Sequence, residues 1–232
     1  MSVLKFLSPG PGAGARSPMQ RQAVAAGAAL ERRDGWEVAV RFDGEAAERG
    51  RCAESVGYAD MSHLGKIEVQ AARDELEQVV GSSLVLGTAT RTETGWLLPY
   101  TPARAIVVCD PGTRAGMLDT LADAAAGVSG HTSVIDVTTT FGAMVITGPQ
   151  ARETFARFTA IDLRPAALPV NGVRPGSVAR TPGAILREGE DRFLMLFGSA
   201  LGQYMWTVVA DAARSLGGGP VGVEALEAVP VA

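Results

Sequence analysis

The chain has 232 residues, of which 47% are hydrophobic and 20% charged, enough to bury a substantial core in one large domain or two small ones. The net charge is −4 and the 21 Lys and Arg residues are spread out, so we expect no nucleic-acid-binding face. Two distant cysteines exclude a disulfide framework, and neither a secretory signal nor a membrane-length apolar run is present. We therefore expect a cytoplasmic protein with two free, buried thiols and no membrane partner.

The N-terminal part begins with a segment rich in Pro and Gly. Residues 1–16 are expected to form a flexible leader, because this composition supports neither a helix nor a strand. The alanine-rich stretch 19–33 predicts a helix, and Asp34-Gly35 is a turn signal. Residues 37–42 then alternate apolar and polar side chains, which predicts a half-buried strand.

The middle of the chain alternates between helix and strand patterns. Thr113 is expected to cap a helix that Gly127 ends. In chain order the predicted elements are a helix over 45–52, a strand over 66–70, a helix over 71–80, a strand over 105–109 and a helix over 113–126.

The C-terminal part adds strands and two helices. The predicted elements are strands over 133–139 and 142–147, a helix over 150–158, a hairpin of 184–187 and 192–197, and a helix over 199–215. Three glycines from Gly217 then break the last helix. This order indicates an α+β fold with mainly antiparallel sheets and helices packed on one face.

Asp60 and His63 are candidate catalytic residues in the sequence Asp-Met-Ser-His, between two predicted strands. The two side chains could form an acid–base pair. Alternatively, the Asp60 and Ser62 side chains could bond the backbone of a turn that His63 ties down. Asp136, inside an apolar strand, is a third candidate, and it could instead cap a loop or meet an arginine.

Other polar groups favour structural roles. The acids of the predicted hairpin tip, residues 188–191, are expected to be solvated. His131 lies in a loop with no partner nearby in sequence, and two distant histidines without a third ligand make a zinc site improbable, so we expect no metal. Asp162 and Arg164 could pair with each other or cap a turn.

Two segments resemble a known family. Ser17-Pro18, Gly35-Trp36-Glu37 and residues 58–65, Tyr-Ala-Asp-Met-Ser-His-Leu-Gly, resemble the opening of the glycine-cleavage T-protein, the tetrahydrofolate-dependent aminomethyltransferase. Residues 134–213 resemble that protein and, more closely, the gamma subunit of heterotetrameric sarcosine oxidase. The resemblance implies a folate-binding-type α+β domain with ferredoxin-like halves over 17–216, followed by a tail over 217–232 in place of the family's C-terminal barrel.

The same resemblance assigns candidate cofactor-binding residues. Leu64 stands where the family has a pocket Met, Cys109 where it has an Asn, and Leu194 where it has a pterin-binding Glu; Glu190 belongs to the same hairpin motif. The stretch that matches the family's catalytic Asp contains none, and the Arg expected near the domain's end falls near Glu224. A leucine cannot hydrogen-bond a pterin edge, so a tetrahydrofolate cofactor would lack several of its usual contacts.

Three hypotheses follow. The first is an accessory subunit of one-carbon or N-methyl amine metabolism that packs on a flavin amine oxidase, on a T-protein-like chain or on itself. The second is a small folate-linked transferase or amine lyase that uses Asp60, His63, Asp136 or Glu190 for acid–base chemistry. The third is a relative of the folate-binding iron–sulfur repair proteins; it ranks last because no Cys follows Gly198.

Overall fold

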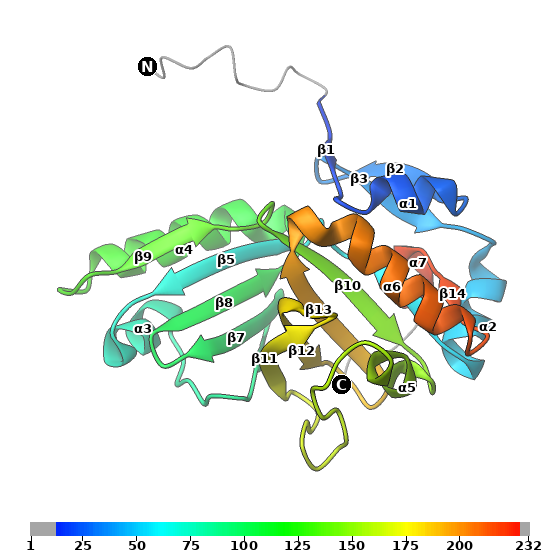
Figure 1. The fold of residues 1–232 in the computed structure, drawn as a ribbon. Coiled ribbons are helices and arrows are strands. Elements are labelled where there is room, and N and C mark those ends of the chain that lie inside the picture. The colour runs from blue at the N-terminus through cyan, green and yellow to red at the C-terminus, as the bar shows by residue number, and fades with distance from the viewer. Residues whose placement is uncertain (1–12, 228–232) are drawn as a thin grey trace.

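The computed structural model describes residues 13–227, in which two large sheets stand side by side (Figure 1). The six-stranded sheet has the order β11 (Val173–Val178), β12 (Thr181–Arg187), β13 (Arg192–Gly198), β10 (Phe141–Thr147), β4 (Gly57–Asp60), β14 (Gly219–Pro220). The five-stranded sheet has the order β6 (Thr90–Thr92), β7 (Gly95–Thr101), β8 (Arg104–Cys109), β5 (Gly65–Gln70), β9 (Ser133–Asp136). All pairs in both sheets are antiparallel except β14 with β4.

Helices cover the outer face of each large sheet. On the five-stranded sheet, α3 (Arg73–Val80) and α4 (Arg114–Ala126) share a core cluster with the strands through Leu76 and Leu121. On the six-stranded sheet, Phe155 and Val209 contribute to a second cluster. The helices on this face are α1 (Gln20–Ala25), α5 (Ala151–Ala156) and α6 (Gly202–Arg214).

The inner faces of the two sheets meet in a third cluster. Trp96 and Ile106 from one sheet pack with Val145 and Leu194 from the other. The helices α2 (Glu45–Glu54) and α7 (Val223–Glu227) contribute to this cluster beside the six-stranded sheet.

Backbone hydrogen bonds connect the two sheets along one edge. The Ala89 N–H donates to the Asn171 carbonyl at 2.7 Å, and the Val173 N–H donates to the Gly87 carbonyl at 2.9 Å. These bonds and the shared core cluster connect the two sheets directly.

A small third sheet lies beside α6 (Figure 1). It consists of β1 (Ala15–Arg16), β3 (Trp36–Arg41) and β2 (Ala29–Arg33), in that order. The predicted helix over 19–33 is wrong in its second half, because Gly27 adopts a φ of +93° and ends the helical run. Residues 29–33 instead pair with β3 across the predicted turn at Asp34-Gly35.

Most other predicted elements occur, with two differences. Thr113 is the N-cap residue of α4, but its side chain forms no capping bond, and its Oγ1 donates to the Asp110 carbonyl at 3.0 Å. The strand predicted over 133–139 ends at Asp136.

The ends of the chain also differ from the expectation. Residues 1–12 of the expected leader lie outside the described residues, whereas Ala15–Arg16 forms β1. The expected tail contributes β14 and α7 to the fold up to residue 227.

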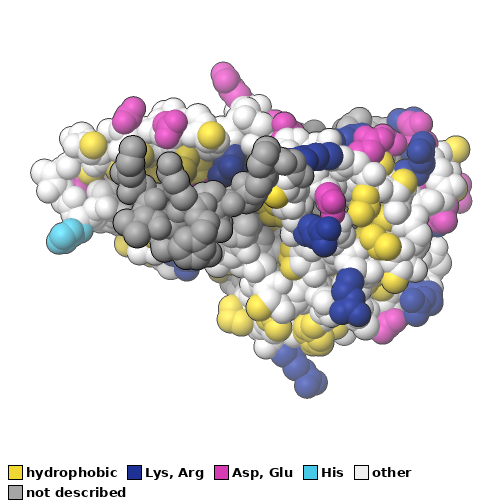
Figure 2. Space-filling view, turned by 90° about the horizontal axis from the view of Figure 1, so that it is seen from above, with side chains coloured by type: hydrophobic (Ala, Val, Ile, Leu, Met, Phe, Trp, Pro, Cys, Tyr) yellow, Lys and Arg dark blue, Asp and Glu magenta, His cyan; other side chains and the backbone are white. Residues whose placement is uncertain are grey.

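On the face seen from above, basic and acidic side chains are mixed over the right-hand part of the view (Figure 2). No helix in the described part of the chain is long and apolar enough to span a bilayer.

Candidate functional site

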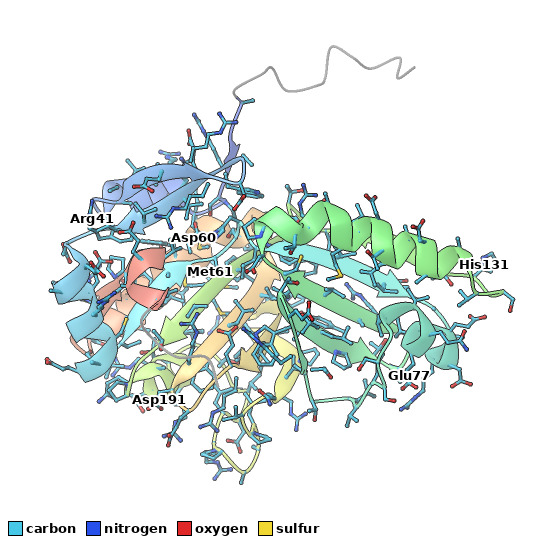
Figure 3. The ribbon with its side chains drawn as sticks, turned by 180° about the vertical axis from the view of Figure 1, so that it is seen from behind. Arg41, Asp60, Met61, Glu77, His131 and Asp191 are labelled. Carbon is cyan, nitrogen blue, oxygen red and sulfur yellow. The ribbon has the colours of Figure 1, made fainter. Side chains whose placement is uncertain are left out.

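The turn between β4 and β5 lies near the centre of the molecule, where Asp60 and Met61 are labelled (Figure 3). Asp60 is the last residue of β4, and its Oδ1 accepts the backbone N–H of Ser62 at 2.9 Å. Burial raises the pKa of the Asp60 carboxyl, although hydrogen bonds from Ser17 and Ser62 act in the opposite direction. The structure thus contains the turn contact proposed for Asp60; its catalytic role stays a prediction.

His63 follows in the same turn but does not pair with Asp60. Burial, together with the positive charges of Lys66 and Arg33, lowers the pKa of His63 to about 4. Asp60 and His63, both among the described residues, share no hydrogen bond. The acidic neighbour that raises the His63 pKa is Asp34. The acid–base pair suggested by the sequence is therefore not assembled in this structure.

Lys66 is a buried cation that sequence inspection did not single out. It is fully buried, and its Nζ donates to the Ser62 carbonyl at 2.8 Å. Burial lowers the pKa of Lys66 to about 8, although the nearby carboxylates of Asp60 and Asp136 raise it. The chain has only one other lysine, Lys5, so this position contrasts with the preference for arginine elsewhere.

Asp136 lies at the end of β9 and is exposed, so the expectation of a core carboxylate is wrong. Its side chain forms an ion pair with Arg114 of α4 and accepts the Thr138 N–H at 2.9 Å. Burial alone would raise the pKa of Asp136, but the bonds from Thr138 and Arg114 lower it. Of the alternatives given by the sequence, the structure contains the arginine contact.

A cavity of about 210 Å³ lies between the inner faces of the two sheets. Three of the four candidate cofactor-binding residues, Leu64, Cys109 and Leu194, line it, and Glu190 does not. Glu190 is exposed in the β12–β13 turn, where its backbone carbonyl accepts the Arg187 guanidinium at 2.7 Å. The structure therefore brings Leu64, Cys109 and Leu194 to one site, while their role in binding stays a prediction.

The charged floor of this cavity is a pair that the sequence interpretation missed. Glu188 is 5% exposed and Arg192 is 8% exposed, and the Arg192 Nε donates to the Glu188 Oε2 at 3.0 Å. The Trp96 Nε1 donates to the other carboxylate oxygen at 3.0 Å. The expectation of a solvated hairpin tip is therefore wrong for Glu188.

The strand register could have revealed this pair. Leu186 pairs with Leu194, and both belong to the inner core cluster. Because side chains alternate along a strand, the residues two positions nearer the turn, Glu188 and Arg192, share that face. The hydrophobic pattern of the hairpin thus predicts a buried acid and a buried base opposite each other.

The remaining cavity wall combines apolar and polar groups. The Arg91 guanidinium stacks over the Trp96 ring at 4.8 Å from its centroid. The Thr94 Oγ1 is buried without a hydrogen-bond partner among the described residues. Cys109 is free, and burial raises the pKa of its thiol, so it is neutral at pH 7. Cys52 is also free and buried, as expected for both cysteines.

The fold and this cavity define a class: a two-sheet α+β domain with a ligand-sized cavity between the inner sheet faces. Residues 94–230 match the sequence model of the GCVT N-terminal domain. The chain belongs to this family of aminomethyltransferase domains, which confirms the resemblance noted from the sequence.

Relatives of known name support the assignment. The chain is 25% identical over 212 residues to an aminomethyltransferase of Acidobacterium capsulatum, covering 82% of this chain and 55% of that one. It is 28% identical over 217 residues to the aminomethyltransferase of Streptomyces coelicolor, covering 86% and 57%. The chain thus spans little more than half the length of these relatives.

Solved structures confirm the α+β fold class. A chain of the heterotetrameric sarcosine oxidase of Corynebacterium sp. U-96 superposes with a TM-score of 0.69 at 21% identity, covering 89% of this chain and 98% of that chain. Aminomethyltransferase T of the Bartonella henselae glycine cleavage system gives 0.73 at 19% identity, covering 91% and 60%. The fold therefore matches nearly the whole of that sarcosine oxidase chain.

Potential metal ligands do not gather in the described part of the chain. Within residues 13–227, no group of three or more His, Cys, Asp or Glu side chains could hold a metal ion. His131 lies at the far end of the five-stranded sheet, away from Asp60 and Met61 (Figure 3).

Proposed function

We propose that this chain is an accessory subunit of a cytoplasmic enzyme of one-carbon or N-methyl amine metabolism. In this proposal its inter-sheet cavity occupies the position of the family's folate site but no longer binds a reduced folate. The observation that carries the proposal is the buried Glu188–Arg192 pair, in which the carboxylate already has hydrogen-bond partners on both oxygens.

The side chains at the three cavity positions that match the family's cofactor contacts do not fit a pterin ring. A pterin edge presents adjacent N–H donors and acceptors, which need polar partners when they are buried. Leu64 and Leu194 offer none, and the neutral thiol of Cys109 is a weak donor and a weak acceptor. At these three positions a buried pterin would therefore lose hydrogen bonds to water without replacing them.

The likeness to a whole chain of a heterotetramer supports a role within a larger assembly. The partner proposed here is a flavin amine oxidase or a T-protein-like chain, and a second copy of this chain is the alternative.

Calorimetry of the purified chain with tetrahydrofolate and with 5,10-methylene-tetrahydrofolate tests the cavity part of the proposal. We expect neither heat of binding nor a thermal shift at millimolar ligand. Submicromolar binding together with aminomethyl transfer by the chain alone would refute it. Co-expression with the products of neighbouring genes, followed by size-exclusion chromatography, tests the assembly, and a chain that stays alone with each of them contradicts the subunit role.

A stand-alone one-carbon transferase or amine lyase is the second candidate. The observation that favours it is the raised pKa of Asp60 beside the lowered pKa of Lys66, a pattern typical of proton-transfer groups. In that case Asp60→Asn would abolish turnover of an amine substrate while the variant remained folded.

A further inference from the structure

Glu188 holds a buried carboxylate at the floor of the inter-sheet cavity. Its Oε1 accepts the Trp96 indole N–H and its Oε2 accepts the Arg192 Nε–H, each at 3.0 Å. Both donors, Trp96 and Arg192, also line the cavity. The carboxylate is therefore neutralised and hydrogen-bonded before any ligand arrives.

Arg192 is held in place by a second contact. Its Nη1 donates to the carbonyl of Leu226 in α7 at 3.3 Å. Leu226 is itself buried in the core cluster between the sheets. The guanidinium thus stands between the carboxylate and the C-terminal helix, and its position is fixed from both sides.

The Arg192 guanidinium presents N–H donors in the same pattern as a ring that binds a carboxylate. A planar carbon bearing two N–H groups occurs in arginine and also in the 2-amino-4-oxopyrimidine edge of a pterin. Either donor would form a charge-assisted bond to the carboxylate, but only the guanidinium adds the Coulomb attraction between opposite charges. A neutral ring that displaced Arg192 would also leave a buried cation without its partner, which is strongly unfavourable.

We propose that Arg192 determines the ligand specificity of the cavity. Its guanidinium bonds the Glu188 carboxylate, which a ligand would otherwise bond. Neutral rings of the pterin class are therefore excluded. This inference rests on the proposed function, in which the cavity no longer takes a reduced folate. Substituting Arg192 would free the Glu188 Oε2 as an acceptor, while Oε1 would keep its bond from Trp96.

Arg192→Met in the full chain tests the inference, since methionine fills much of the same volume without donors. We expect the variant to bind tetrahydrofolate at least tenfold more tightly than the wild type in anaerobic calorimetry. The double variant Glu188→Gln/Arg192→Met should show no gain, because the carboxylate is missing. Arg91→Met is the matched control: it removes another cavity-lining arginine, one that stacks on Trp96.

Arg192→Gln is the second variant, for the case that Arg192→Met does not fold. Its neutral amide can still hydrogen-bond Glu188, and a ligand can displace that amide. We expect a smaller gain for this variant. If a variant is folded by circular dichroism and neither substitution tightens binding, or if the double variant gains as much, the inference is wrong and the proposed function is untouched. Tight binding by the wild type itself would instead contradict the proposed function.

Discussion

Replacing Lys66 with methionine is expected to stabilise the protein at neutral pH. Burial lowers the pKa of Lys66 from 10.5 to about 8, so folding disfavours its charged form. At about 1.4 kcal/mol per pKa unit, the destabilisation of the charged state is about 3 kcal/mol. Methionine loses the Nζ bond to the Ser62 carbonyl, worth about 1 kcal/mol, which leaves a net gain of about 2 kcal/mol at pH 7.

The pH dependence gives the sharper test. Because the folded-state pKa of Lys66 lies below its unfolded value, the destabilisation is complete below pH 8 and disappears as pH rises to 10.5. Burial also raises the pKa of Cys52 to about 11 and of Tyr58 to about 12, which lowers stability at high pH. The wild type and the Lys66→Met variant both contain Cys52 and Tyr58. The difference between their free energies of unfolding therefore isolates the contribution of Lys66.

Urea unfolding followed by tryptophan fluorescence measures this difference. We expect Lys66→Met to be the more stable protein at pH 7, with the advantage shrinking steadily toward pH 10.5. An advantage that stays constant over this range, or a variant less stable at pH 7, would show that Lys66 is not a buried, destabilising cation.

Three further predictions concern other parts of the molecule. Arg114→Gln removes the largely solvated ion pair with Asp136 and should cost at most about 1 kcal/mol in thermal unfolding; a loss twice as large would contradict the surface assignment. Gly222→Ala places a Cβ against the Val40 backbone and should cost about 3 kcal/mol, with faster amide exchange in α7; unchanged exchange would argue against this close contact. The imidazole resonances of His63 should not move between pH 8 and 5.5 in NMR titrations, because burial lowers its pKa to about 4, and a midpoint near 6.5 would refute this.

The sequence predicted the elements whose periodicity is local. In α6, Met205 and Val209 recur on one buried face, and the strand β8 is a continuous apolar run. The helix prediction failed around Gly27, and local periodicity could not show that β9 and β10 belong to different sheets. Sheet membership depends on contacts between distant segments, which periodicity does not encode.

The site was predictable only in part, for a related reason. The family resemblance pointed to Leu64, Cys109 and Leu194, which the fold brings to one cavity. The acids of the hairpin were interpreted as a group, although alternation separates the buried Glu188 from the exposed Glu190. Asp136 looked buried because its neighbours are apolar, but it lies at the end of an edge strand.

The parallel pairing of β14 with β4 constrains when the protein can acquire its structure. Gly219 and Pro220 lie beside Gly57 and Tyr58, across most of the chain, and the adjoining α7 completes the cluster between the sheets. A nascent chain therefore cannot close the six-stranded sheet until Pro220 has left the ribosome. Until then the apolar groups of β4 and β10 lack their final cover, and this long-range pairing should slow folding.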